Sequence, residues 1–165
     1  MSRYDDVYES LQVAGVRFVI VGGMAVVLSG HVRMTVDLDL VVDLAPEPAA
    51  RAMQSLTGLG LLPRVPVRPD DFADPAVRQE WIDTKHMQVL SFHDPQQPAR
   101  EVDVFVAYPI DFEHLLAAAV PTRVGDRTVL VASIEDLITM KRAAGRTQDL
   151  ADIEALQRLK DQAGP

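Results

Sequence analysis

The chain has 165 residues, 48% of them hydrophobic, and a formal net charge of −8. This length suits a single domain with a real core, the apolar content excludes a disordered acidic tail, and the acidity argues against a surface built to grip DNA. No cysteine is present, which excludes disulfides, zinc–thiolate sites and thiol chemistry.

Two further absences bear on location. The first six residues lack the basic start and apolar run of a signal peptide. The longest apolar stretch, residues 18–30, is too short to span a bilayer and is interrupted by glycines. We therefore expect a cytoplasmic protein without a membrane partner.

The first half of the chain alternates helical and extended patterns. The spacing of apolar residues predicts helices over 4–14, 24–29 and 49–59. Wholly or alternately apolar runs predict strands over 17–21 and 35–44. Gly22-Gly23 forms the turn between the first strand and the second helix.

The second half starts with a proline-rich and charged stretch, 62–75, that is typical of a long irregular loop. Strands are predicted at 87–92 and 102–106, joined as a hairpin, so the sheet should be mixed. A short helix at 112–119 and a small hairpin at 124–131, turning at Gly125-Asp126, follow.

A helical tail ends the chain. Ser133 and Asp136 have the form of a helix cap, Gly145 closes that helix, and Thr147 is the predicted cap of the last one. The last helix is expected to bury Leu150, Ile153, Leu156 and Leu159. The pattern predicts an α+β (α/β) fold: a mixed sheet flanked by helices in residues 1–132, with 133–165 as a helical extension of the same domain.

The segment 36–42, Val-Asp-Leu-Asp-Leu-Val-Val, is the most informative one. A strand turns alternate side chains to opposite faces, so Val36, Leu38, Leu40 and Val42 can enter a core while Asp37 and Asp39 share the other face. Like charges this close repel, and a divalent cation with a preference for oxygen ligands resolves the conflict. If the strand at 102–106 is a neighbour, Asp103 completes a set of three metal-binding carboxylates. The alternative for each aspartate is a solvated position on an edge strand.

Cationic and polar residues provide candidates for binding a nucleotide. Gly22 and Gly23, at a strand-to-helix turn, permit close approach of phosphate oxygens, although glycine there can serve geometry alone. Lys141 and Arg146 could clamp phosphates, or could instead interact with a helix C-terminus. Asp149 could pair with Arg146. Arg33, Thr35 and Lys85 could contact substrate, and each is also explained as a solvated residue.

These residues together resemble the polymerase-beta-like nucleotidyltransferase superfamily: Gly22-Gly23, then Asp37-Leu38-Asp39, then Asp103 in an apolar strand. The resemblance implies that the glycine turn contacts a nucleoside triphosphate and that the three catalytic aspartates hold two Mg²⁺ or Mn²⁺ ions. It also implies transfer of a nucleoside monophosphate to a hydroxyl with release of pyrophosphate, with Asp39 or Asp103 assisting deprotonation of the acceptor.

The runs 33–40 and 136–153 are similar to a bacterial branch of small stand-alone members, including the nucleotidyltransferase subunit of abortive-infection toxin–antitoxin systems. This resemblance implies an RNA or protein acceptor and a toxin or antitoxin partner chain. Arg33, Lys141, Arg146 and Asp149, which lie in these two runs, are candidate nucleotide-binding residues. Gln148 departs from the pattern, because relatives commonly carry lysine there.

Two alternatives stay open. One is a catalytically silent, antitoxin-like binding protein that keeps the fold, which three clustered carboxylates disfavour. The other is an enzyme that modifies a small sugar or antibiotic, which the acidic charge permits.

Overall fold

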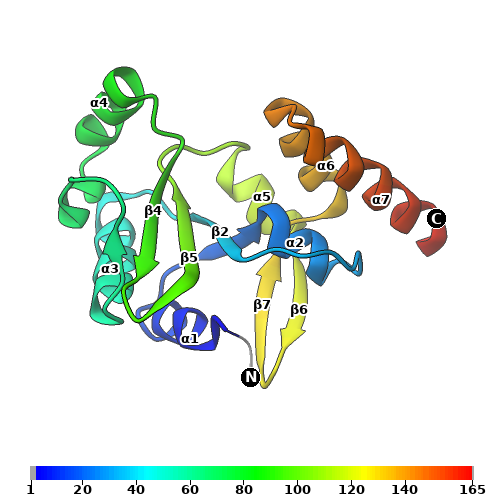
Figure 1. Cartoon of the computed structure of the whole chain (residues 1–165), viewed down its shortest axis with the longest axis horizontal. Coiled ribbons are helices and arrows are strands. Elements are labelled where there is room, and N and C mark those ends of the chain that lie inside the picture. Colours follow the sequence, from blue (N-terminus) through cyan, green and yellow to red (C-terminus); the bar gives the residue numbers. More distant parts are fainter. Residues whose placement is uncertain (1–2, 165) are drawn as a thin grey trace.

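The computed structural model describes residues 3–164. The helices are α1 (Asp5–Val13), α2 (Gly22–Leu28), α3 (Pro46–Gly58), α4 (Pro75–Lys85), α5 (Phe112–Ala118), α6 (Ile134–Ala144) and α7 (Thr147–Ala163), with a 3₁₀ turn, η1, at Pro69–Ala73. The strands are β1 (Phe18–Val21), β2 (Asp37–Val42), β3 (Leu62–Pro63), β4 (Val89–Asp94), β5 (Gln97–Phe105), β6 (Val120–Val124) and β7 (Arg127–Val131). Figure 1 shows their arrangement.

One sheet joins all the strands, in the order β3-β4-β5-β2-β1-β7-β6. β2 lies at its centre, antiparallel to β1 and parallel to β5. The hairpins β4–β5 and β6–β7 are antiparallel, and β1 pairs with β7 in parallel. The sheet is therefore mixed, which confirms the predicted fold class.

Alternation along β2 and β5 divides the sheet into an apolar and a polar face. Leu38 and Leu40 on β2, and Val102 and Val104 on β5, are all fully buried. The residues between them are only partly buried and include the aspartates. The apolar face thus fixes the register, because a one-residue slip would bury the acidic set instead.

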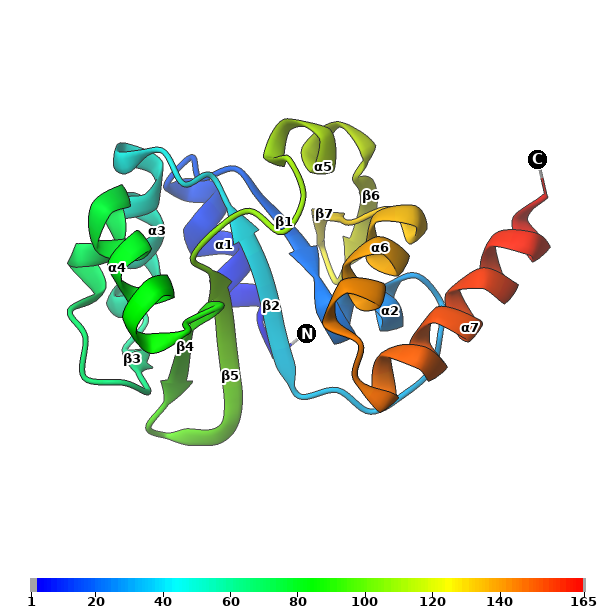
Figure 2. The same ribbon diagram turned by 90° about the horizontal axis from the view of Figure 1, so that it is seen from above.

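Helices cover this sheet and extend beyond it. α1 packs against α3, and α2 packs against both β2 and α6. α7 runs outward from the body of the molecule, and the segment between α2 and β2 passes beside its first turns (Figure 2). The tail is therefore placed next to the glycine turn that starts α2.

Several local predictions were wrong. The stretch 62–75 contains β3 and η1, and α4, which was not predicted, follows at once. Its start was signalled by Asp74, whose side chain accepts a hydrogen bond from the Ala76 N–H at 2.8 Å, and by Pro75 in the first turn. The β4–β5 hairpin is longer and tighter than expected, and the second hairpin starts at Val120.

Three single residues were also misplaced. Val36 precedes β2 and is 45% exposed, because its carbonyl is held by the Tyr4 hydroxyl outside the ladder. Leu150 is 61% exposed, because α7 turns Asp149 and Asp152 inward instead. Arg146, not Thr147, occupies the cap of α7 and shares a capping box with Asp149.

Residues 3–164 contain no helix with the length and apolar character needed to cross a bilayer.

Candidate functional site

The three aspartates meet on the polar face of the sheet. In the β2–β5 ladder, Asp39 lies opposite Asp103 and Asp37 lies opposite Glu101. All four side chains share one face, because residues two apart on a strand point the same way. The predicted neighbourhood of the two acidic strands is therefore confirmed, and a fourth carboxylate, Glu101, joins them.

The glycine turn packs directly onto this acidic group. Gly22 has φ +65°, and a Cβ there would lie 2.0 Å from Oδ2 of Asp39. The Gly23 N–H donates a hydrogen bond to the Asp39 carboxylate. A Cβ on Gly23 would lie 2.6 Å from Nη2 of Arg33 and 2.7 Å from Oγ1 of Thr35. The two glycines thus make room for the protein's own polar side chains beside the turn.

Crowding of like charges raises the pKa of the carboxyls. Burial, followed by the charges of Asp103 and Asp37, raises the pKa of Asp39 to about 6. Burial also raises the pKa of Asp103 and of Asp37, with Glu101 adding to both. The nearby cations therefore do not fully offset the rise in the pKa of these three carboxyls.

The donor chemistry of this group fits a divalent cation. Carboxylate oxygens are the ligands that Mg²⁺ and Mn²⁺ prefer, and Oδ1 of Asp103 is buried with no hydrogen-bond partner. Across residues 3–164, however, no three acidic or histidine side chains are gathered closely enough to form a ready-made cage. The aspartates are neighbours in the sheet whose carboxylates would have to turn toward a common ion.

β4 adds polar residues that sequence reasoning missed. Ser91 lies opposite Asp103 and its side chain hydrogen-bonds to that carboxylate, while His93 lies opposite Glu101. Nδ1 of His93 is buried and has no hydrogen-bond partner. Strand alternation would have found both residues had the β4–β5 register been known.

Arg64 is a cation at this face that was also missed. Its Nε and Nη2 donate to the two carboxylate oxygens of Glu101 at 2.7 and 3.1 Å. Its charge counters the rise in the pKa of Asp37 and of Asp103. Arg64 follows the short strand β3, in the stretch that was predicted to be irregular.

The predicted cations of the tail lie in an ion cluster with a buried centre, which we call the tail cluster: Arg33, Lys141, Arg146, Asp149 and Asp152. The Lys141 side chain is 7% exposed, and its Nζ lies 3.2 Å from Oδ1 of Asp149 and 2.6 Å from Oδ2 of Asp152. The Lys141 charge also counters the rise in the pKa of Asp39.

Arg146 and Asp149 are paired, as the tail sequence suggested. The Arg146 Nε donates to Oδ2 of Asp149 at 2.9 Å, while most of the Arg146 side chain stays exposed. Burial alone would raise the pKa of Asp149, but hydrogen bonds from Arg146 and Lys141 outweigh it and hold the pKa low. Asp149 is therefore an anion that holds cations in this structure.

Lys85 is exposed at the C-terminal end of α4, and its contact with a nucleotide stays a prediction.

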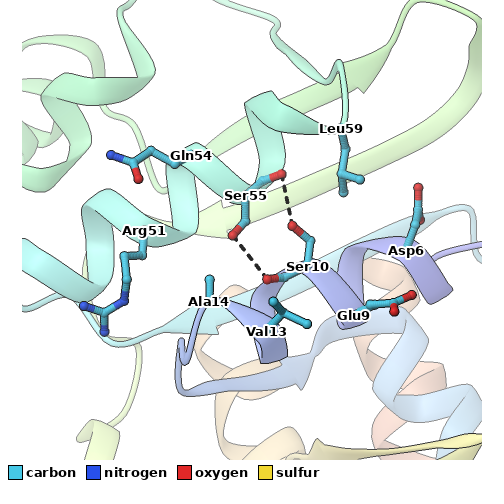
Figure 3. A pocket seen from close by; sticks show the side chains of 9 residues that line it. All are labelled: Asp6, Glu9, Ser10, Val13, Ala14, Arg51, Gln54, Ser55 and Leu59. Carbon is cyan, nitrogen blue, oxygen red and sulfur yellow. Dashed lines mark hydrogen bonds between the residues drawn. The ribbon is translucent and has the colours of Figure 1, made fainter.

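A cavity of about 520 Å³ lies elsewhere, between α1 and α3 (Figure 3). Ser10 and Ser55 join the two helices at its floor through reciprocal hydrogen bonds of 3.4 Å to backbone carbonyls. None of the candidate site residues lines it.

Comparison with known proteins gives matches in structure alone. No protein-family model matches the chain, and no curated protein does. The lincomycin-bound lincosamide antibiotic adenylyltransferase LnuA matches with a TM-score of 0.62 and 16% identity, over 93% of each chain. The antibiotic-resistance factor ANT(2'')-Ia matches with a TM-score of 0.56 and 14% identity, over 94% of this chain and 88% of that one.

A third solved structure is an antigenic nucleotidyltransferase-like protein from Paracoccidioides brasiliensis. It matches with a TM-score of 0.54 and 19% identity, over 96% of this chain and 78% of that one. At these identities the likeness is one of fold. The chain has the nucleotidyltransferase fold, as its sequence predicted.

Proposed function

We propose that the protein is a magnesium-dependent nucleotidyltransferase that moves a nucleoside monophosphate from a nucleoside triphosphate to a hydroxyl acceptor. The observation that carries this proposal is the register of β2 and β5, which sets Asp37, Asp39 and Asp103 on one face beside the glycine turn. The nucleotidyltransferase fold of the structural neighbours supports it.

Each part of the site has a role in this reaction. Asp37, Asp39 and Asp103 hold Mg²⁺ or Mn²⁺, which when bound neutralises the phosphates and activates the attacking hydroxyl. Gly22, Gly23, Thr35 and the cations Arg33, Lys141 and Arg146 face the triphosphate. Lys85, exposed at the end of α4, is a further candidate nucleotide contact.

The chemistry is a single displacement. The acceptor oxygen forms a bond to the α-phosphorus, and the bond from that phosphorus to the bridging oxygen of the β-phosphate breaks. Pyrophosphate leaves with the bonding electrons. The hydroxyl proton passes to Asp39 or Asp103, and from there to solvent.

The acceptor class has two candidates. The tail sequence, by resemblance, favours RNA or protein and a toxin or antitoxin partner chain. A small hydroxylated antibiotic is favoured by the structural likeness to an antibiotic adenylyltransferase and to an antibiotic-resistance factor. The chain's charge of −8 also suits a neutral or cationic acceptor better than a polyanion.

Label transfer tests the function. The protein is incubated with Mg²⁺ and each of the four nucleoside triphosphates, labelled at either the α- or the γ-phosphate, with total RNA, total protein or a panel of hydroxylated antibiotics. We expect α-label on one acceptor class and γ-label in pyrophosphate. Asp37→Asn/Asp39→Asn protein should transfer nothing.

Two results would contradict the proposal. Label from the γ-phosphate on the acceptor would mean phosphoryl transfer instead. Silence with all four nucleotides and every acceptor would favour a catalytically silent binding protein.

A further inference from the structure

Asp152 is the residue around which the tail cluster is built. Its side chain is completely buried, and it was not a predicted site residue. Oδ2 accepts a hydrogen bond from Arg33 Nη2 at 3.1 Å and forms an ion pair with Lys141 Nζ at 2.6 Å. Oδ1 accepts a hydrogen bond from Gln148 Nε2 at 3.2 Å and lies 2.9 Å from Arg33 Nε, an ion pair without hydrogen-bond alignment. One carboxylate therefore ties together α6, α7 and the segment before β2.

Asp152 lies on the inward face of α7 with Ile153 and Leu156. Removing one partner of a buried ion group is costly, because the remaining charge is left uncompensated. The Asp152 carboxylate and the cations around it therefore depend on one another for their positions.

Arg33 links this carboxylate to the glycine turn. Its guanidinium presents Nε and Nη2 to Asp152, and the same Nη2 lies beside Gly23, where a Cβ would be 2.6 Å away. The Arg33 side chain is only 18% exposed, so its orientation is fixed by packing and by this carboxylate.

We propose that Asp152 is a positioning residue that aims Arg33 at the glycine turn. It touches no substrate itself. This inference rests on the proposed function, which places the triphosphate at that turn. It also gives Gln148 a role in this chain: its neutral amide completes the partners of Asp152, where a lysine would add a further charge.

The test uses magnesium tripolyphosphate, which presents the phosphate chain without a base or sugar. Its affinity is measured by calorimetry for the wild type, Asp152→Asn, Arg33→Lys and the double variant, with Asp161→Asn as a control on an exposed part of α7. Arg33→Lys keeps the charge but loses the planar fork that Asp152 holds. Unfolding midpoints show which variants are folded.

Both single variants should bind about tenfold more weakly, because each loses the alignment of a charge-assisted hydrogen bond to phosphate. The double variant should be only slightly weaker than either, because both changes remove the same alignment. Asp161→Asn should match the wild type.

Wild-type affinity in Arg33→Lys would overturn the inference while leaving the proposed function intact, and so would losses that simply multiply in the double variant. Should Asp152→Asn not fold, Arg33→Lys alone decides the question. No binding by the wild type would overturn the proposed function, and this inference with it.

Discussion

At the scale of single residues, the acidic group is arranged at a cost to stability. Asp39 is largely buried between Gly22 and Asp103, and its ionised form is disfavoured by two neighbouring carboxylates. A chain selected for stability alone would place a neutral side chain there. The unfavourable charge is the expected counterpart of a site that waits for a cation.

Asp39→Asn should therefore stabilise the metal-free protein. The pKa of Asp39 is raised from 3.8 to about 6, so the ionised carboxylate destabilises the fold above pH 6 by about 2–3 kcal/mol. Between pH 6 and 4 the folded state binds the proton more tightly than the unfolded state, so the penalty shrinks as the pH falls. Below pH 4 the carboxyl is protonated in both states, and the penalty is gone.

Denaturant unfolding in chelator-containing buffer checks this prediction. The free energy of unfolding of Asp39→Asn should exceed that of the wild type by about 2–3 kcal/mol at pH 8, and this difference should shrink as the pH falls through 6 toward 4. A gain that is the same at every pH would show that packing, not charge, is responsible.

Site residues could be predicted from the sequence where they are recognised from their immediate sequence neighbours. The alternation around Asp37 and Asp39 and the glycine turn needed only neighbours in the sequence. Glu101, Ser91 and His93 could not be placed, because they join the site through the register of the β4–β5 hairpin. Asp152 was likewise hidden, since its partners Arg33 and Lys141 come from distant segments.

At the scale of elements, the turn from β1 into α2 holds the two halves of the site together. Gly22 lies against Asp39, and Gly23 lies against Arg33 and Thr35. The left-handed backbone of Gly22 and the close contact both require glycine. This turn therefore sets the distance between the acidic group and the tail cluster.

Gly22→Ala should abolish magnesium–nucleotide binding, because its Cβ would lie 2.0 Å from Oδ2 of Asp39 and push that carboxylate away. Gly15→Ala is the matched control: Gly15 has φ +67° and nothing within 4 Å of its Cβ. Gly15→Ala should lose about 1 kcal/mol of unfolding free energy from backbone strain, and Gly22→Ala should lose more, because Asp39 must also move. Only Gly22→Ala should lose binding, measured by calorimetry; equal binding by the two variants would contradict this role of the turn.

Helices and strands were predicted correctly where the spacing of apolar residues was regular. The predictions failed where tertiary contacts determined the structure or the buried face of a helix. β1, β2, α3 and α6 fell close to their expected positions. α4 was missed because its buried residues are Trp81 and the charged Arg78, so its inward face lacks an apolar helical pattern. The inward face of α7 was misassigned because buried ion pairs replaced an apolar position, with Leu150 turned outward.

At the scale of the whole molecule, the fold places two oppositely charged groups on either side of one turn. The acidic group comes from β2 and β5, and the tail cluster comes from α6, α7 and the segment before β2 (Figure 2). A metal-bound triphosphate has the complementary pattern of cation and anion. The helical tail is thus part of the site that we propose.

The most direct test is calorimetric titration of a magnesium–nucleoside triphosphate into the wild type and into Asp37→Asn/Asp39→Asn, with Asp161→Asn as control. The account predicts binding by the wild type and by the control, loss of binding in the double variant, and loss in the wild type when Mg²⁺ is chelated. Equal affinity in all three proteins, or binding that does not depend on Mg²⁺, would contradict it.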